Sequence, residues 1–238
     1  AGAFQASDLI IRDPHVDAAA FAGAVVNPPL ESLGAAKTVL LAVKPQIWRE
    51  AIADVVPYLA PDAVIVSIAA GVRAADISQA FGGRRVARVM PTTAVAIGRG
   101  AASLYADDAE ALGRAQALFA PVAAVAILPA EDLMHAATAV SGSAPAYLYA
   151  FVEALEAAGA VQGLDAADSA RLARATIIGA AALMEKSGEE PAELRKQVTS
   201  PGGTTAAALA VLMGEGGFGD LLPKALDAAV ARSKELGG

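Results

Sequence analysis

The segment Ser200-Pro201-Gly202-Gly203-Thr204-Thr205 has the residue types best suited to binding a small anion. It precedes a predicted helix, and a helix start offers unpaired backbone N–H groups and the positive end of the helix dipole. Two glycines let the backbone curl closely around a ligand, and three hydroxyls add donors. A carboxylate or phosphate could therefore be held without a lysine or an arginine. A helix N-cap with a flexible turn would have the same residues, and the pattern alone leaves both interpretations open.

Three more turns follow predicted strands and are candidates for a nucleotide site. They are Lys44-Pro45, Ala69-Ala70-Gly71 and Met90-Pro91-Thr92-Thr93. In a doubly wound sheet, ligands bind where the strands reach their carboxyl ends, and small residues let a flat ligand lie against the backbone. Each turn alone could be an ordinary connection from strand to helix, but three on successive strands favour a nucleotide site.

Arg12 ends the first predicted strand, where such folds recognise the ribose of adenosine. An arginine there favours a 2′-phosphate and hence NADP over NAD. The neighbouring Asp13 could instead bind a free ribose hydroxyl, so the sequence leaves NAD possible.

Composition excludes several classes of protein. The 238 residues carry a formal net charge of −7, include no cysteine and only two histidines, and are 55% hydrophobic. Disulfides, thiolate zinc sites and thiol catalysis are therefore excluded, and a histidine-rich metal site or a Ser-His-Asp triad is disfavoured. The acidic net charge argues against binding to nucleic acid or anionic membranes. The apolar runs stop well short of the about 18 residues that a transmembrane helix needs. We expect a folded, cytoplasmic protein with no metal site.

The first half of the chain alternates apolar strand-like runs with helical stretches, which is typical of an α/β fold with a doubly wound parallel sheet. Predicted strands cover residues 9–11, 39–43, 63–68, 86–90, 101–105 and 123–128. Predicted helices cover residues 46–56, 74–81 and 108–119.

The second half reads as helical only. Helices are predicted over residues 145–159, 165–186, 191–198, 204–213 and 218–236. Several have alanine on every face, and a helix that is apolar all round must be buried. We expect a dinucleotide-binding domain over residues 1–129 and a helical domain over 130–238 that forms a homodimer.

Five ordered motifs together resemble the pyrroline-5-carboxylate reductase family. They are Leu41-Ala42-Val43-Lys44-Pro45-Gln46, Ser67-Ile68-Ala69-Ala70-Gly71-Val72, Arg88-Val89-Met90-Pro91, Ser141-Gly142-Ser143-Ala144-Pro145-Ala146-Tyr147 and Val198-Thr199-Ser200-Pro201-Gly202-Gly203-Thr204-Thr205. The resemblance implies a Rossmann domain, a dimerising helical domain and NAD(P)H-dependent reduction of 1-pyrroline-5-carboxylate to L-proline, the last step of proline biosynthesis. It also implies that five dimers can assemble into a ring.

The resemblance assigns roles by position. The residues implied to line the cofactor are Ala42, Val43, Lys44, Pro45, Ile68, Ala69, Ala70 and Gly71, with Arg12 and Asn27 near its adenosine half. The residues implied to bind the substrate carboxylate are Ser200, Gly202, Gly203 and Thr204. Thr205 is implied to hydrogen-bond the ring nitrogen and is the candidate catalytic residue.

Two features depart from the family pattern. After Met90-Pro91 the family usually has Asn-Thr-Pro, whereas this chain has Thr92-Thr93-Ala94. No Gly-x-Gly-x-x-Gly precedes the first predicted strand, although a Rossmann fold opens with a strand, a glycine-rich turn and a helix. We expect that a strand–turn–helix unit of about 20–30 residues precedes the sequence given.

Two alternative functions stay open on the residues. One is another NADP-linked reductase resembling the β-hydroxyacid dehydrogenases, which usually place a catalytic lysine in the helical domain; Lys186 and Lys196 near helix ends match this poorly. The other is a non-catalytic paralogue that keeps the dimerising helices but lacks a pyrophosphate loop.

Overall fold

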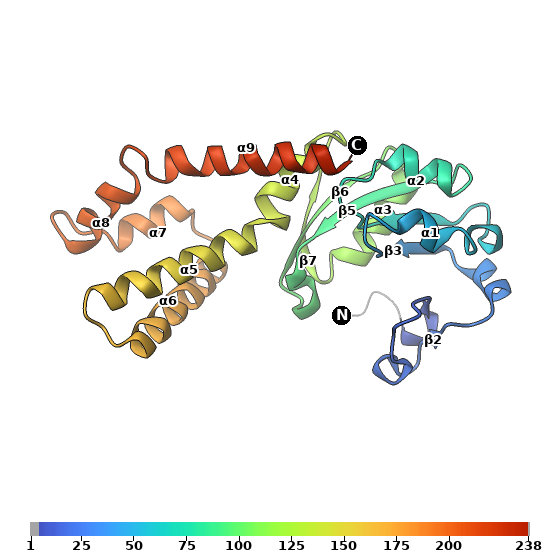
Figure 1. Cartoon of the computed structure of the whole chain (residues 1–238), viewed down its shortest axis with the longest axis horizontal. Coiled ribbons are helices and arrows are strands. Elements are labelled where there is room, and N and C mark those ends of the chain that lie inside the picture. Colours follow the sequence, from blue (N-terminus) through green and yellow to red (C-terminus); the bar gives the residue numbers. More distant parts are fainter. Residues whose placement is uncertain (1–4, 238) are drawn as a thin grey trace. The chain divides into compact units, whose positions relative to one another are not determined.

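A computed structural model describes residues 5–237 and divides them into two compact units (Figure 1). The first unit contains the described residues up to Gly142 together with those from Ala229 onward. The second unit is Ser143–Ala228. The expected domain boundary after residue 129 stays a prediction.

The first unit contains a five-stranded sheet in the order β3-β4-β5-β6-β7. The strands are β3 (Thr38–Leu41), β4 (Val64–Ser67), β5 (Val86–Pro91), β6 (Gly100–Tyr105) and β7 (Ala123–Ile127). Strands β3, β4 and β5 are parallel, as are β6 and β7, but β5 and β6 run antiparallel. The α/β fold class is confirmed, and the described sheet is mainly parallel, with the β5–β6 pair departing from the expected parallel order. Only the short 3₁₀ turn Thr93–Ile97 joins β5 to β6, and a parallel crossover needs about a dozen residues or more.

The N-terminal part of the described chain forms a separate parallel pair. Strand β1 (Ile10–Ile11) lies within the strand predicted at residues 9–11, and it pairs with β2 (Val25–Val26), which the sequence did not predict. Two residues are too few to give a hydrophobic period. Within the described residues, β3 forms one edge of the five-stranded sheet.

Helices cover both faces of the sheet. The core on one face includes Trp48, Ile65 and Phe81, while Val64 and Val66 point to the core on the other face. This alternation follows from the two-residue period of a strand. The covering helices are α1 (Trp48–Ile52), α2 (Ala74–Ala80) and α3 (Ala109–Phe119). Continuous apolar strands were therefore a correct signal for a sheet buried on both sides.

The helix predicted over residues 46–56 is too long. Helix α1 ends at Ile52, and a 3₁₀ turn, Val56–Tyr58, follows it. Pro57 has no N–H to donate and disfavours α geometry at the residue before it, so the helix cannot continue. Other 3₁₀ segments connect the elements of this unit: Ala6–Asp8, Ala18–Phe21 and Leu30–Ala35.

The five helices predicted beyond residue 130 are confirmed, with ends that move by two residues at most. They are α5 (Ala144–Val161), α6 (Ala166–Ser187), α7 (Pro191–Gln197), α8 (Thr204–Leu212) and α9 (Phe218–Gly237). A shorter helix, α4 (Leu133–Ala137), runs into a π-helical turn, Thr138–Gly142, and both belong to the first unit. Helices α5 and α6 approach closely, since a Cβ at Gly159 would collide with the Ser169 hydroxyl, which donates to Glu156 O at 2.7 Å.

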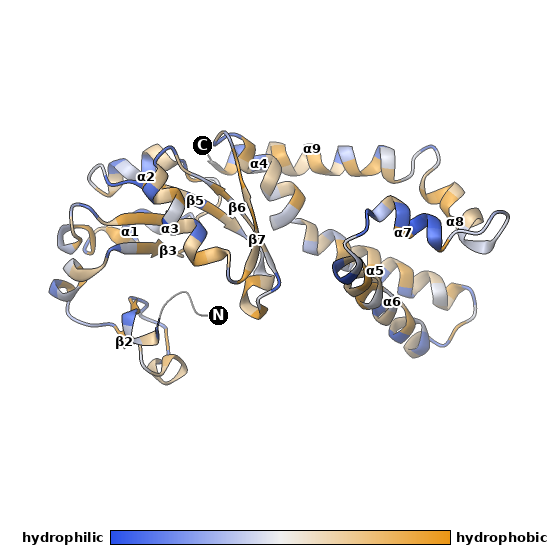
Figure 2. Ribbon diagram, turned by 180° about the vertical axis from the view of Figure 1, so that it is seen from behind, coloured by the Kyte–Doolittle hydropathy of each residue, from blue (hydrophilic) through white to orange (hydrophobic). Residues whose placement is uncertain are grey.

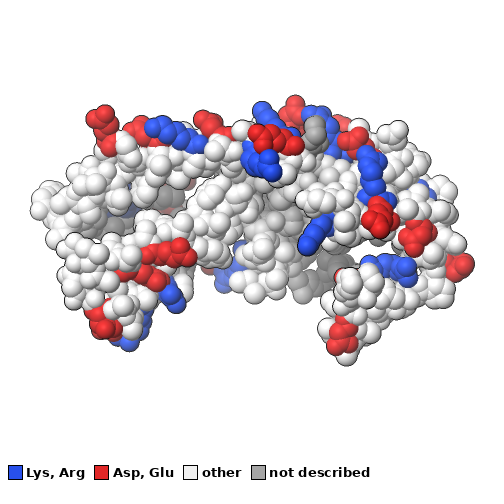
Figure 3. All heavy atoms as spheres, in the orientation of Figure 1, with Lys and Arg blue, Asp and Glu red and all other residues white. Residues whose placement is uncertain are grey.

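The helical unit exposes much apolar surface. Val161 is 82% exposed, Val211 74% and Ile178 69%. Figure 2 colours most of α8 as hydrophobic, and Figure 3 shows its surface without charged side chains in that view. In the described part of the chain, no helix combines the length and hydropathy needed to cross a membrane.

The aromatic core of the first unit provides a test of the fold. Phe81 is fully buried, so Phe81→Ala should lower the free energy of unfolding of this unit by about 3–5 kcal/mol through lost burial and a cavity. Trp48, the only tryptophan, packs in the same cluster and reports its unfolding in urea by fluorescence.

Ile97→Ala is the matched control, because Ile97 is 77% exposed and should change stability by no more than about 0.5 kcal/mol. Equal effects of the two substitutions would contradict this packing.

Candidate functional site

The register of β3 and β4 brings two predicted cofactor turns together. Leu41 pairs with Ser67 at the carboxyl ends of these neighbouring strands, and Ile68 N donates to Leu41 O at 3.1 Å. The turns at residues 42–45 and 68–71 therefore start side by side on one edge of the sheet. This is where a doubly wound sheet binds nucleotides.

The second of these turns is shaped by small residues. Ala69 is buried and its N–H donates to the Ser67 hydroxyl at 3.2 Å, while Ala70 is exposed. Gly71 has φ of 78°, a left-handed conformation that residues with a Cβ rarely adopt. A flat ligand can approach the backbone of such a turn closely, and contact of this turn with a cofactor stays a prediction.

Arg12 and Asn27 lie together at the ends of β1 and β2. Arg12 Nη1 donates to Pro28 O at 3.3 Å. The Asn27 side chain bonds the backbone of Asp13 twice, through Nδ2 to O at 2.8 Å and through Oδ1 to N at 3.0 Å. The Asn27 amide therefore holds the two strand ends together, and its position near an adenosine stays a prediction.

Thr92, which departs from the family pattern, closes the turn after β5. Its backbone N–H donates to Ala101 O at 2.8 Å, and its hydroxyl accepts from Ala101 N at 3.0 Å. The threonine hydroxyl is thus engaged by the opposite strand, so it fixes the β5–β6 turn.

The segment from Ser200 to Thr205 lies in the other unit, at the start of α8. Gly202 has φ of 69°, and Gly203 N donates to Ser200 O at 3.1 Å, which closes a tight turn. The first intrahelical bond joins Ala207 N to Gly203 O, so the N–H groups of the three preceding residues have no acceptor within the helix. Ser200, Gly202 and Thr204 are exposed, and Gly203 and Thr205 are half-buried.

The predicted residues therefore form two groups. The cofactor candidates belong to the first unit, and the anion-binding candidates belong to the second. The geometry within each group agrees with its predicted chemistry, and the assigned roles stay predictions.

Sequence reasoning missed a buried ion pair next to the second cofactor turn. Arg88 lies in β5 with only 5% of its side chain exposed, and its Nη1 donates to Glu131 Oε1 at 2.9 Å. The same oxygen accepts from Ala74 N, the first residue of α2, at 2.7 Å. An arginine inside an apolar strand demands a buried partner, but that partner comes 43 residues later and no local pattern marks it.

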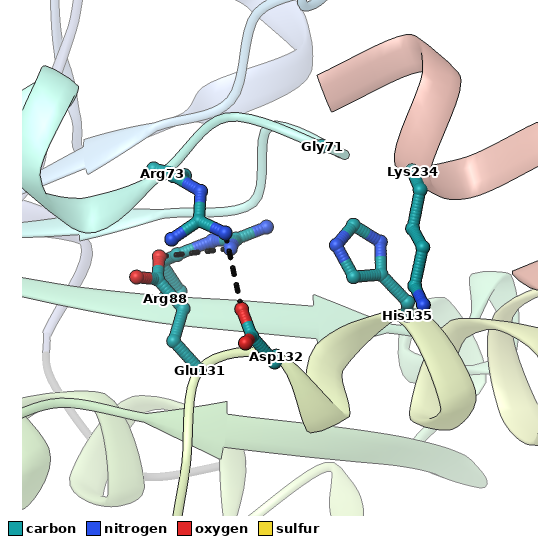
Figure 4. Close-up of a pocket in the computed structure, with 7 residues that line it drawn as sticks. All are labelled: Gly71, Arg73, Arg88, Glu131, Asp132, His135 and Lys234. Atoms are coloured by element: carbon teal, nitrogen blue, oxygen red, sulfur yellow. Dashed lines mark hydrogen bonds and ion pairs between the residues drawn. The ribbon is translucent and has the colours of Figure 1, made fainter. Parts of the chain in front are cut away.

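A cavity of about 280 Å³ adjoins this ion pair (Figure 4). Its lining residues are Gly71, Arg73, Arg88, Glu131, Asp132, His135 and Lys234. His135 Nδ1 is 2.9 Å from Ser233 Oγ. Burial lowers the pKa of His135, and the positive charges of Arg88 and Lys234 lower it further, so the imidazole is neutral at pH 7.

Comparison with known proteins identifies the family. A family model described as pyrroline-5-carboxylate reductase dimerisation matches residues 131–236. A pyrroline-5-carboxylate reductase of Pseudomonas aeruginosa is 39% identical over 240 residues, covering 99% of this chain and 88% of the relative. The pyrroline-5-carboxylate reductase of Synechocystis is 39% identical over 210 residues, covering 87% of this chain and 78% of the relative. The chain belongs to the pyrroline-5-carboxylate reductase family.

Solved structures agree with this membership. The pyrroline-5-carboxylate reductase of Coxiella burnetii has a TM-score of 0.87 at 31% identity and covers 96% of this chain and 88% of its own. The Plasmodium falciparum pyrroline carboxylate reductase, solved with NADP bound, has a TM-score of 0.80 at 26% identity. The match covers 98% of this chain and 89% of the Plasmodium chain. The resemblance drawn from the five motifs is thus confirmed.

The buried ion pair generates a stability prediction. Glu131→Ala leaves the buried Arg88 charge unpaired and removes the acceptor of Ala74 N, so the free energy of unfolding should fall by about 3–5 kcal/mol. Trp48 fluorescence in urea measures the change.

Asp132→Ala is the matched control, because Asp132 pairs with Arg73 on the surface, with 77% and 55% of the two side chains exposed. Its loss should cost less than about 1 kcal/mol. If Glu131→Ala lowered the free energy of unfolding as little as Asp132→Ala does, the Arg88–Glu131 pair would not stabilise the first unit.

Proposed function

We propose that this chain reduces 1-pyrroline-5-carboxylate to L-proline, with NADPH as the hydride donor. The observation that carries the proposal is the start of α8, where glycines and free N–H groups form a neutral site for a carboxylate. Membership of the reductase family supplies the substrate class.

The start of α8 binds the substrate carboxylate in this proposal. Backbone N–H groups and the positive end of the helix dipole stabilise the anion. Ser200 and Thr204 are exposed there and add hydroxyl donors. An acidic chain with a net charge of −7 needs such a local site to attract an anionic substrate.

Thr205 positions the ring nitrogen in this proposal. The reduction needs a hydride at the imine carbon and a proton at nitrogen, and the nicotinamide supplies the hydride when bound. A pyrroline nitrogen is basic enough to be protonated part of the time near neutral pH, so a hydroxyl group can suffice where a strong acid is absent. Orientation would then supply most of the catalysis.

The cofactor site in this proposal consists of the turns at residues 42–45 and 68–71. Arg12 favours the 2′-phosphate of NADPH, because its guanidinium uses one N–H for Pro28 O and keeps other donors. The Plasmodium relative was solved with NADP bound, which supports the same preference. NADH stays a weaker substrate in this account.

The assembly proposed is a homodimer, with five dimers forming a decamer in the cytoplasm. The exposed apolar side chains of the helical unit and the match to a dimerisation family support the dimer.

Neither alternative function gains support from this fold. Lys186 and Lys196 are both exposed, and Lys196 pairs with Glu193 at 2.6 Å, so neither resembles a catalytic lysine.

The role of Thr205 can be tested by kinetics. Thr205→Ala should lower kcat/KM for pyrroline-5-carboxylate roughly 10-fold or more, because about 1.4 kcal/mol of transition-state stabilisation is lost. NADPH consumption at 340 nm measures the rate.

Thr205→Ser keeps the hydroxyl and is the matched control, with kcat/KM expected near that of the unsubstituted chain. If Thr205→Ala also left kcat/KM unchanged, Thr205 would have no part in the mechanism. A panel of β-hydroxyacids supplied with NADP⁺ should give no NADPH formation at 340 nm.

The assembly proposal predicts the mass of the particle in solution. Light scattering at micromolar concentration should give at least twice the 23.7 kDa of one chain, because the apolar side chains of the helical unit need a partner surface. A monomeric mass at this concentration would refute dimerisation.

A further inference from the structure

The cavity beside the Arg88–Glu131 pair has a polar lining in which positive charges predominate. Arg73, Arg88 and Lys234 bring three cations, and Glu131 and Asp132 bring two carboxylates. Local positive charge is unusual in a chain whose net charge is −7. The volume of about 280 Å³ is several times the ~30 Å³ that one water molecule occupies in the liquid.

Arg88 keeps unused donors that face this space. Its side chain is 5% exposed, and Nη1 makes its one hydrogen bond, to Glu131. In the described part of the chain no buried side-chain nitrogen lacks a partner, yet Nε and Nη2 of Arg88 make no hydrogen bond. Both atoms must therefore reach open space, and Arg88 lines the cavity.

His135 and Lys234 face the arginines from the opposite side (Figure 4). His135 Nδ1 is engaged by Ser233, which leaves Nε2 for a ligand. Lys234 lies in the last turn of α9 and makes no salt bridge or hydrogen bond among the described residues. Side chains from three elements, Arg88 of β5, His135 of α4 and Lys234 of α9, thus line the cavity with nitrogen atoms that make no hydrogen bond within residues 5–237.

We propose that this cavity is a binding site for a small oxyanion of the phosphate class, held by Arg88, His135 and Lys234. Charge-assisted hydrogen bonds from a guanidinium and an ammonium group suit phosphate oxygens. The cavity belongs to the first unit, whereas the start of α8 belongs to the second, and the proposal does not depend on the proposed reaction. Its phosphate can be inorganic phosphate or part of a nucleotide.

The anion should bind more tightly as the pH falls. The groups around His135 are Arg73, Arg88 and Lys234, which lower its pKa, and Asp132, which raises it, with Glu131 neutralised by Arg88. A bound anion raises the pKa of His135 again, so binding takes up a proton. For sulfate, an oxyanion whose own charge does not change in this range, affinity therefore increases from pH 8 to pH 6.

The test is a calorimetric titration of the full chain with inorganic phosphate at constant ionic strength. Saturable binding is expected, weakened about 10-fold or more in Lys234→Gln, which removes one charge-assisted hydrogen bond. Lys224→Gln is the matched control, since Lys224 is an exposed cation on the same helix that does not line the cavity. No saturable binding, or equal loss in both variants, would overturn the proposal.

Two further measurements identify the source of the anion and the role of His135. If NADPH displaces phosphate from the unsubstituted chain, the site serves a nucleotide phosphate; if both bind together, it serves a free oxyanion. By NMR, phosphate should shift the ring resonances of His135 and leave those of His15, the only other histidine, in place. A phosphate effect of the same size on both histidines would contradict a site at His135.

Discussion

The contact on which the first unit depends is the half-buried carboxylate of Glu131. One oxygen of this group accepts from Arg88 in the sheet and from the first N–H of α2. Residues 68–71 connect β4 to the segment that leads into α2, so this carboxylate fixes one end of the proposed cofactor turn. Removing charged groups from water costs free energy, and the two hydrogen bonds to the Glu131 carboxylate offset that cost only when both are made. The same pair forms a wall of the polar cavity and aims the remaining Arg88 donors into it.

The chemistry proposed for this chain needs few reactive side chains. Without cysteine and with two histidines, the sequence offers little for nucleophilic or metal catalysis. Reduction of an imine by hydride transfer needs a bound carboxylate, an oriented ring and a proton at nitrogen. Backbone amides at the start of α8 and the hydroxyl of Thr205 can meet the first and last of these needs. The scarcity of cysteine and histidine and the excess of small residues are thus consistent with a mechanism in which the chain mainly orients the substrate and the cofactor.

Much of this could be predicted from the sequence, because the informative signals were local. Apolar runs such as residues 63–68 marked strands buried on both sides, and the helices predicted from residues 145 and 165 begin within one residue of those positions. The antiparallel β6 was missed because strand direction depends on the length and path of a connection, which composition does not reveal. Helix α1 ends at Ile52, short of the predicted residue 56, because Pro57 cannot continue a helix. The partner of Arg88 could not be predicted at all, since it is 43 residues away and follows from the tertiary fold.

The central claim is that the chain transfers hydride directly from NADPH to the imine carbon of pyrroline-5-carboxylate. The most direct measurement uses NADPH carrying deuterium on the transferable position of C4, followed by mass spectrometry of the product. The account predicts proline one mass unit heavier, with the deuterium bonded to C5, in amounts equal to the NADPH consumed. Proline without deuterium, or NADPH consumption without proline, would contradict it.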